Sequence, residues 1–311
     1  MILARGLRKS WGATAAVDGL ALEVGRGEIF GLVGPDGAGK TTAIRLLCGI
    51  LDADRGSASV AGFDVRAAPE EVKRRIGYMS QRFSLYGDLT VAENLRFFAE
   101  LHHVPRKERR EREAGLLEFS RLAPYRDRLA QNLSGGMKQK LALACTLVHE
   151  PAVVLLDEPT TGVDPVSRRE FWRLLSEFLS QGITIFMATP YLDEAERCSR
   201  IALMSNGHVL AVDRPSQMRA SFPDEIVEVL ATPPGQAEAC VRGVPGVHDV
   251  QAFGERLHVR VARGASDRTL RDVSAAFAQA GVQVTSLRVV PASLEDVFID
   301  RVVTTRATGA V

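Results

Sequence analysis

The residues with the clearest chemical use lie in one short loop near the N-terminus. The loop fits G-x-x-x-x-G-K-[ST], a pattern in which glycines let backbone N–H groups close around phosphate oxygens. The lysine of this pattern reaches the β- and γ-phosphates, and the hydroxyl after it can ligate Mg²⁺. The residues predicted to hold a nucleotide are Gly34, Pro35, Asp36, Gly37, Ala38, Gly39, Lys40, Thr41 and Thr42.

The segments on either side of this loop are the elements that it needs. Residues 28–33 form a short, mostly apolar run that predicts a buried strand. Apolar residues at helical spacing follow over 42–48, so we expect a helix to begin at Lys40. The N-terminus of that helix adds partial positive charge beside the phosphates. Strand, loop and helix together predict a phosphate-binding site.

Two adjacent carboxylates follow a second apolar run. Residues 152–156 predict a buried strand, and the strand ends in Asp157 and Glu158. Open α/β sheets bind ligands at the carboxyl ends of their strands, which gives this pair a use beside a phosphate loop. We expect Asp157 and Thr41 to hold Mg²⁺ and Glu158 to orient or deprotonate an attacking water.

A second helix start also exposes its backbone through glycines. Ser134 is a good N-cap for the apolar helix over 141–148, and Gly135 and Gly136 follow it. Alone this pattern is an ordinary capped helix, but after a phosphate loop it is a candidate second anion site. Trp11 precedes the loop and has two interpretations, namely packing in the core and stacking on an adenine ring.

The composition sets limits on the class of protein. The chain has 311 residues, of which 46% are hydrophobic and 25% charged, so it can bury a core. Its net charge of +1 argues against nucleic-acid binding by bulk charge. The four cysteines form no C-x-x-C pair, which is typical of reduced thiols in the cytoplasm. No run of about 18 apolar residues is present, so we expect any membrane role to depend on a partner.

The pattern divides the chain into an α/β domain over 1–220 and a smaller domain over 226–303. The second domain predicts the order βαββαβ, which is typical of a ferredoxin-like α+β fold. It holds no cluster of catalytic residue types, and we interpret it as an accessory or dimerisation domain. Its predicted elements are strands 226–231, 247–253, 256–262 and 283–290 and helices 235–242 and 267–280.

Residues 1–220 resemble the nucleotide-binding subunit of ABC transporters. The order of the motifs carries this resemblance, because Leu133–Gln139 is similar to the family signature and Leu155–Pro159 to its carboxylate segment. The resemblance implies a P-loop NTPase core with an antiparallel β-subdomain and a helical subdomain at about 82–140. It also implies that Trp11 stacks on adenine, that Gln81 senses Mg²⁺ and contacts the membrane subunit, and that Asp164 couples two sites across a dimer.

The resemblance further implies the partners. Two subunits face each other, and ATP with Mg²⁺ lies between the phosphate loop of one chain and Ser134, Gly135 and Gly136 of the other. Such a subunit is peripheral, at the cytoplasmic face of the membrane, beside a separate integral permease. Within the family, some segments resemble drug- and antibiotic-exporter subunits that serve ABC-2-type permeases. These segments are Phe83–Tyr86, Leu89–Leu95, Thr161–Pro165, Leu192–Glu196 and Pro291–Ile299.

Two positions depart from the family pattern. Pro190 replaces the usual histidine, and proline has neither an imidazole nor a backbone N–H. We expect slow ATP turnover at this chain's own site and hence a heterodimer with a competent second nucleotide-binding domain; the alternative is that a neighbour such as Thr189, or water, covers the role. Asp36 stands where Asn or Ser is usual, and a carboxylate beside phosphates either weakens binding or pairs with a cation on the facing subunit.

Three functions therefore follow from the sequence. The leading one is an ATPase that powers efflux of a drug, antibiotic or lipid-like substrate through a separate permease. The second is a mainly regulatory ATP-binding partner of a competent subunit. The third is a soluble ABC ATPase without a transport role, which the sequence disfavours because it has neither a second such domain nor a coiled-coil insertion.

Overall fold

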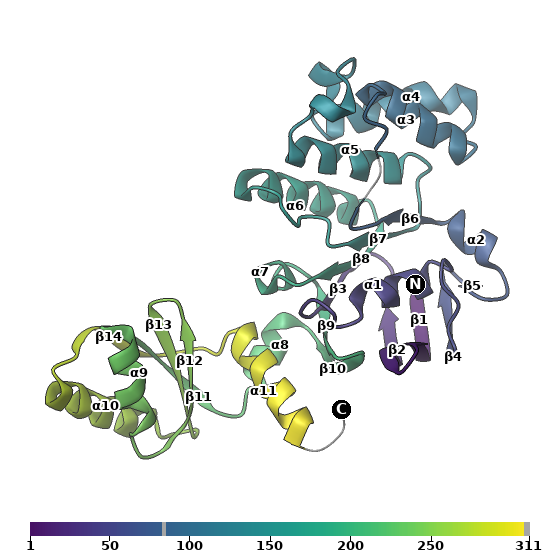
Figure 1. The fold of residues 1–311 in the computed structure, drawn as a ribbon. Coiled ribbons are helices and arrows are strands. Elements are labelled where there is room, and N and C mark those ends of the chain that lie inside the picture. The colour runs from purple at the N-terminus through teal and green to yellow at the C-terminus, as the bar shows by residue number, and fades with distance from the viewer. Residues whose placement is uncertain (83–84, 308–311) are drawn as a thin grey trace. The chain divides into compact units, whose positions relative to one another are not determined.

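A computed structural model describes residues 1–82 and 85–307 and divides into two units (Figure 1). The first unit comprises Met1–Arg214 together with the chain from Thr304 onward, and the second comprises Pro215–Val303. The sequence pattern ended the first domain at residue 220, whereas the helix α8 (Pro215–Ala220) groups with the second unit. Phe83 and Ser84, which contribute to the likeness to exporter subunits, lie outside the described residues.

The centre of the first unit is a six-stranded sheet in the order β10-β9-β3-β8-β7-β6. All neighbours are parallel except β10, which pairs antiparallel with β9. The strands β3, β7 and β8 are buried along their whole length, which explains their continuous apolar sequence. The bounds are β3 Ile29–Val33, β6 Ile76–Met79, β7 Val153–Asp157, β8 Thr184–Thr189, β9 Arg200–Ser205 and β10 His208–Asp213.

A second, antiparallel sheet forms from the N-terminal residues and has the order β2-β1-β4-β5. It shares one hydrophobic core with the helix α1 (Lys40–Leu47) and with the large sheet, whose Phe30 and Phe186 rings stack at 5.7 Å within it. This core fixes the base of the phosphate loop. The strands are β1 Ile2–Trp11, β2 Thr14–Val24, β4 Arg55–Val60 and β5 Phe63–Asp64, and a short helix α2 (Pro69–Lys73) follows them.

The remaining part of the first unit is mainly helical. In Figure 1, α3 and α4 lie above α5, and α5 lies above α6. Thr90 begins α3 with a capping box, in which its hydroxyl accepts from the Glu93 N–H while the Glu93 carboxylate accepts from the Thr90 N–H. The helices are α3 Val91–Leu101, α4 Arg106–Phe119, α5 Gly135–Leu147, α6 Pro165–Ser180 and α7 Leu192–Ala195.

The second unit has the predicted βαββαβ order. Its four strands form an antiparallel sheet in the order β12-β13-β11-β14, which is the ferredoxin-like arrangement. Valine side chains of this sheet form a core with α9 and α10, in which Val273 and Phe277 of α10 are fully buried. The elements are β11 Glu225–Thr232, α9 Pro234–Arg242, β12 Val247–Phe253, β13 Arg256–Val261, α10 Ser266–Ala280 and β14 Gln283–Val290, followed by α11 Leu294–Ala307.

Across residues 1–82 and 85–307, no helix combines the length and the apolar character needed to cross a bilayer.

Candidate functional site

Four parallel strands end at one edge of the large sheet, and their ends carry the predicted site residues. The strand β3 leads into Gly34, β7 ends at Asp157, β8 ends one residue before Pro190, and β6 ends two residues before Gln81. In the sheet order, β8 lies between β3 and β7. Pro190 therefore follows the strand that separates the phosphate loop from the carboxylate pair.

The phosphate loop needs glycine at two positions because the backbone passes very close to other segments. A Cβ atom at Gly34 would lie 2.1 Å from the Met204 carbonyl oxygen, and one at Gly39 would lie 2.0 Å from that of Ala16. Gly39 also has φ of 103°, in the left-handed region, and is the N-cap of α1. The glycines thus bring the loop and the helix N-terminus together, as the sequence predicted.

Lys40, the first residue of α1, is 3% exposed, and its ammonium contacts several oxygen atoms. Its ammonium donates to the carbonyl oxygens of Gly34 at 2.8 Å and Pro35 at 3.0 Å, and its Nζ lies 3.1 Å from Oε1 of Glu158. Two hydrogen bonds and one ion pair thus surround this ammonium.

Glu158 is held from several sides. It is 7% exposed, and its other oxygen, Oε2, accepts from Nε2 of Gln81 at 3.0 Å. Its backbone N–H donates to the Ala188 carbonyl at 2.9 Å, and its φ of 50° lies in the left-handed region. A non-glycine residue in that region is strained, and such strain is concentrated at functional sites. The structure thus brings Lys40, Glu158 and Gln81 into one contact chain.

Asp157 is fully buried, and one of its two carboxylate oxygens has no hydrogen-bond partner among the described residues. The Thr41 hydroxyl donates to Oδ1 at 3.0 Å, whereas Oδ2 has no hydrogen-bond partner among the described residues. Burial raises the pKa of the Asp157 carboxyl. The hydrogen bond from Thr41 lowers this pKa, whereas the charge of Glu158 raises it further. A buried carboxylate oxygen without a partner, next to a hydroxyl, is the kind of oxygen donor set that Mg²⁺ accepts.

We expect Asp157→Asn to stabilise the nucleotide-free chain at neutral pH. A carboxyl with a raised folded-state pKa costs stability once it is ionised, and this cost grows as pH rises from the ordinary value of 3.8 through the folded value. The amide cannot ionise, so the variant should gain on the order of 1 kcal/mol at pH 7. Thermal unfolding of both proteins between pH 4 and 7 checks this. A variant that is less stable at pH 7 than at pH 4, relative to the parent, would contradict it.

A hollow of about 300 Å³ opens above these groups. Asp36 is exposed at its rim, and no described cation lies within ion-pair distance of the Asp36 carboxylate. Ala16 also lines the hollow, although nothing in its sequence context identified it. The lining residues are Ala16, Asp36, Gly37, Gly39, Lys40, Thr41, Thr42, Gln81 and Glu158.

The predicted second anion site does not line this hollow. Ser134 caps α5 as expected, because its hydroxyl accepts from the Met137 N–H at 3.3 Å. Asp164 caps α6 and accepts from the N–H groups of Val166 and Ser167 at 3.0 and 2.9 Å. A Cβ atom at Gly136 would lie 2.2 Å from the Ser167 hydroxyl oxygen, so the starts of α5 and α6 are closely packed. The start of α5 is therefore separate from the hollow around Lys40.

Trp11 and Pro190 also have defined positions. Trp11 is the last residue of β1, not part of the connection after it, and it is 57% exposed with the Lys9 ammonium 5.3 Å from its ring centroid. This exposure excludes the packing of Trp11 in the core. Pro190 is half-buried, and the Thr189 before it is fully buried. The Thr189 hydroxyl donates to Glu194 Oε2 at 2.7 Å, so its hydrogen is already in use.

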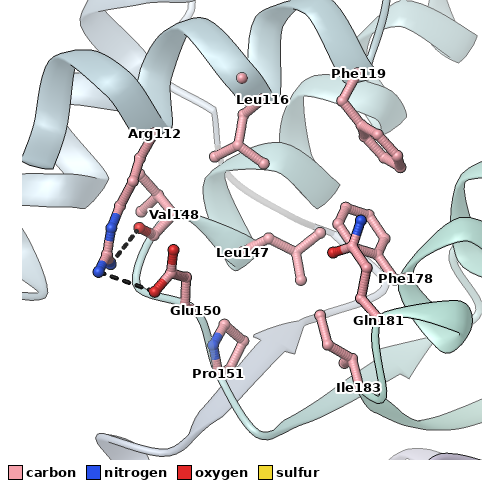
Figure 2. A pocket seen from close by; sticks show the side chains of 11 residues that line it. Arg112, Leu116, Phe119, Leu147, Val148, Glu150, Pro151, Phe178, Gln181 and Ile183 are labelled. Carbon is pink, nitrogen blue, oxygen red and sulfur yellow. Dashed lines mark hydrogen bonds and ion pairs between the residues drawn. The ribbon is translucent and has the colours of Figure 1, made fainter.

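A larger hollow of about 480 Å³ lies between α4, the end of α5 and the end of α6 (Figure 2). Figure 2 shows apolar side chains around it, among them Leu116, Phe119 and Leu147. The charged side chain Arg112 is engaged at its edge, with Nη2 2.9 Å from Glu150 and Nη1 donating to the Val148 carbonyl at 3.3 Å. This apolar groove fits a hydrophobic surface better than a phosphate. Its lining is completed by Gly115, Pro151, Phe178, Gln181 and Ile183.

The fold and the site define a P-loop ATPase of the ATP-binding-cassette class. Residues 17–161 match the family model of the ABC transporter domain, and residues 214–302 match that of the C-terminal domain of DrrA1-3-like ATP-binding proteins. The chain belongs to the ATP-binding proteins of ABC transporters, as the sequence motifs predicted.

Relatives support this assignment over most of the chain. The daunorubicin resistance ATP-binding protein DrrA2 of Streptomyces coeruleorubidus is 36% identical, over 96% of this chain and 94% of its own length. The Nod factor export ATP-binding protein I of Ralstonia nicotianae is 37% identical, over 94% of this chain and 91% of its own. The probable multidrug ABC transporter ATP-binding protein YbhF of Escherichia coli is 41% identical over 92% of this chain, but this chain spans only 49% of it.

Solved structures agree on the fold. A structure of an ATP-binding subunit of an ABC transporter has a TM-score of 0.65 and 30% identity, and covers 71% of this chain and 93% of its own. CbiO1 from Clostridium perfringens, part of the ABC transporter complex cbiONQ, has a TM-score of 0.66 and 29% identity, with 71% and 90% covered. The solved structures thus assign the fold of an ABC ATPase core to this chain.

Proposed function

We propose that this protein is the ATP-binding subunit of an ABC-2-type exporter, which couples ATP binding and hydrolysis to efflux through a separate permease. The observation that carries the proposal is the meeting of Lys40, Thr41, Asp157 and Glu158 at one sheet edge. The names of DrrA2 and of the Nod factor export protein support a drug, antibiotic or lipid-like substrate. The subunit would act at the cytoplasmic face of the membrane, without binding nucleic acid.

Each residue of the site then has a role. The phosphate loop and Lys40 bind the β- and γ-phosphates, and the helix dipole of α1 adds to their attraction. Thr41 and Asp157 hold Mg²⁺, which supplies charge neutralisation at the phosphates. Glu158 orients the attacking water or accepts its proton. Gln81, whose side-chain amide donates to Glu158, would report the occupancy of the site to the permease.

The ATP site is proposed to be shared between two subunits. The open helix start at Ser134, Gly135 and Gly136 lies outside the hollow around Lys40, so it is free to complete the site of a facing subunit. Asp164 caps α6 beside Gly136, and this proximity supports its role in coupling the two sites. Trp11, exposed at the end of β1, is available to stack on adenine.

We further propose that the site on Lys40 and Glu158 of this chain turns ATP over slowly. Pro190 supplies no donor to the γ-phosphate. The alternative, that Thr189 takes over this role, is disfavoured by its complete burial and by its hydrogen bond to Glu194. The pairing with a competent second nucleotide-binding domain, and hence a heterodimer, follows from this slow site. A mainly regulatory role for this chain is the second candidate function, and the same observation favours it.

The apolar groove is the proposed contact for the permease. It lies in the helical part of the unit, its walls are apolar, and its one lining arginine is already engaged. It would take the apolar face of a short segment of the membrane partner, while Gln81 and the residues up to 100 transmit the motion.

The experiment that tests this assignment is isolation from membranes. We expect the tagged chain to isolate together with a multi-span permease, and Leu116→Glu to reduce the recovered permease at least tenfold, because a charge would be buried in the groove. The exposed Glu118→Gln on the same helix is the matched control. ATP binding should be equal in all three proteins. Full recovery with the Leu116→Glu variant would contradict docking in the groove, and absence of any permease would contradict the exporter assignment.

A further inference from the structure

One buried carboxylate in the first unit has no role in the chemistry described above. Glu194 of α7 is fully buried, although its neighbours Asp193 and Glu196 are exposed. Its Oε1 accepts from the Thr160 hydroxyl, and its Oε2 accepts from the Thr189 hydroxyl at 2.7 Å. A buried carboxylate is costly unless its oxygens are satisfied, so both hydroxyls are needed to keep it there.

The first of these hydroxyls belongs to the loop that carries the catalytic carboxylate. Thr160 is 1% exposed and follows Glu158 by two residues. The loop turns tightly around it, because the Thr161 N–H donates to the Glu158 carbonyl at 3.3 Å and the Val163 N–H to the Thr160 carbonyl at 3.1 Å. Fixing the Thr160 side chain therefore fixes the backbone on which Glu158 sits.

The second hydroxyl belongs to the turn that carries Pro190. Thr189 accepts from the Tyr191 N–H at 3.0 Å through the same hydroxyl oxygen that bonds Glu194, which closes the turn around the proline. Its carbonyl oxygen accepts from the Gly34 N–H at 3.3 Å, so this turn also touches the first residue of the phosphate loop. The side chain of Glu194 is thus a bridge between two loops that have no sequence continuity.

The guanidinium of Arg168 lies near this bridge but makes no hydrogen bond to Glu194. The Nε of Arg168 lies 3.9 Å from Glu194 Oε1, and it has no hydrogen-bond partner among the described residues. The guanidinium also lies 4.8 Å from the Tyr191 ring centroid. Arg168 is in the first turns of α6, the helix that Asp164 caps. The positive charge compensates the buried carboxylate and ties the bridge to the start of α6.

We propose that Glu194 is a positioning residue, which keeps the Glu158 loop and the Pro190 turn in a fixed position relative to each other. Its two acceptor oxygens add a side-chain link between the Glu158 loop and the Pro190 turn to the backbone hydrogen bond from the Glu158 N–H to the Ala188 carbonyl. Loss of the bridge would loosen the connection between the two loops, which would then be joined through the backbone hydrogen bond from Glu158 to Ala188, without removing any group that touches ATP. This inference rests on the proposed ATPase site, but the juxtaposition of the two loops can be tested without turnover.

The first test measures amide hydrogen exchange of the full chain. Thr160→Val and Thr189→Val each remove one arm of the bridge and keep the volume of the side chain. We expect each variant to speed exchange about tenfold in both segments, 158–163 and 188–192, although each substitution touches only one of them. Glu196→Gln, in the same acidic segment but exposed, should change neither segment. Faster exchange confined to the segment that carries the substitution would overturn the proposal.

The second test separates binding from turnover. Glu194→Leu removes both acceptor oxygens, so neither the Thr160 nor the Thr189 hydroxyl keeps its partner. We expect it to lower kcat about tenfold and to leave the KM for ATP within twofold. Both constants are measured in the Pro190→His background, which provides a measurable rate. An equal rise in KM would assign Glu194 to nucleotide binding and overturn the positioning role. If Pro190→His gives no gain in rate, the slow-site proposal fails, and the exchange result still decides the bridge.

Discussion

Replacing Pro190 with histidine should raise the rate of ATP hydrolysis by the isolated chain about tenfold or more. A positioned acid–base or hydrogen-bonding side chain contributes on the order of 10²- to 10⁴-fold to such reactions, and a single substitution recovers only part of this. The turn is already held by Thr189, whose hydroxyl bonds both the Tyr191 N–H and Glu194. An imidazole at 190 would therefore enter a fixed position between the phosphate loop and Glu158. Steady-state hydrolysis at saturating ATP is the measurement.

The matched control for this prediction is Pro190→Ala, which restores the backbone N–H without adding an imidazole. If alanine raises the rate as much as histidine does, the limiting defect is the proline backbone. If neither changes the rate, Pro190 does not limit turnover and the proposed asymmetry between two subunits loses its basis. Melting temperatures of the two variants should agree within a few degrees, which excludes a difference in folding as the cause.

Lys40→Met should lower the affinity for ATP at least 100-fold and also destabilise the empty protein. Lys40 is buried with Glu158, and removing one partner of a buried ion pair costs about 3 kcal/mol or more because the other charge is left uncompensated. Loss of affinity follows from loss of the ammonium beside the phosphates. Nucleotide titration by fluorescence and chemical denaturation measure the two effects separately.

A second substitution distinguishes these effects. Glu158→Gln in the Lys40→Met background removes the uncompensated charge, so it should restore much of the stability and none of the affinity. Lys9→Met is the control for a lysine whose ion pair with Asp54 is at the surface, and it should change stability by less than about 1 kcal/mol. Recovery of ATP affinity in the Lys40→Met, Glu158→Gln double variant would show that Lys40 acts mainly by restraining Glu158.

The sequence predicts those parts of the site in which a functional residue directly adjoins, along the chain, the strand or helix that positions it. The phosphate loop follows its strand directly, and Asp157 ends its own, so apolar runs alone placed both at a sheet edge. The ferredoxin-like unit was also predictable from the sequence, because glycine and proline breaks separate its strands and helices. The comparisons confirm the fold class and the family, whereas the roles of individual site residues stay predictions.

The rest depended on contacts between distant segments. Glu194 lies in an acidic stretch that indicates an exposed helix, and only the approach of Thr160 and Thr189 makes it buried. The apolar groove is built from the ends of three helices, none of which marks it alone. The position of α8 was missed for the same reason, since a helix that follows a hairpin can pack on either side of a domain boundary.

The contacts of Lys40 imply an order of events when a nucleotide binds. Its ammonium hydrogen-bonds the carbonyl oxygens of Gly34 and Pro35 and pairs with the carboxylate of Glu158, so an arriving phosphate competes with these three groups. A phosphate would replace the contact with Glu158, because both groups are anions that pair with the Lys40 ammonium. Loss of this contact releases one carboxylate oxygen at the moment the nucleotide arrives. Under the proposed role of Glu158, this order would hold its carboxylate against Lys40 until a phosphate binds, and would so limit reaction before the nucleotide arrives.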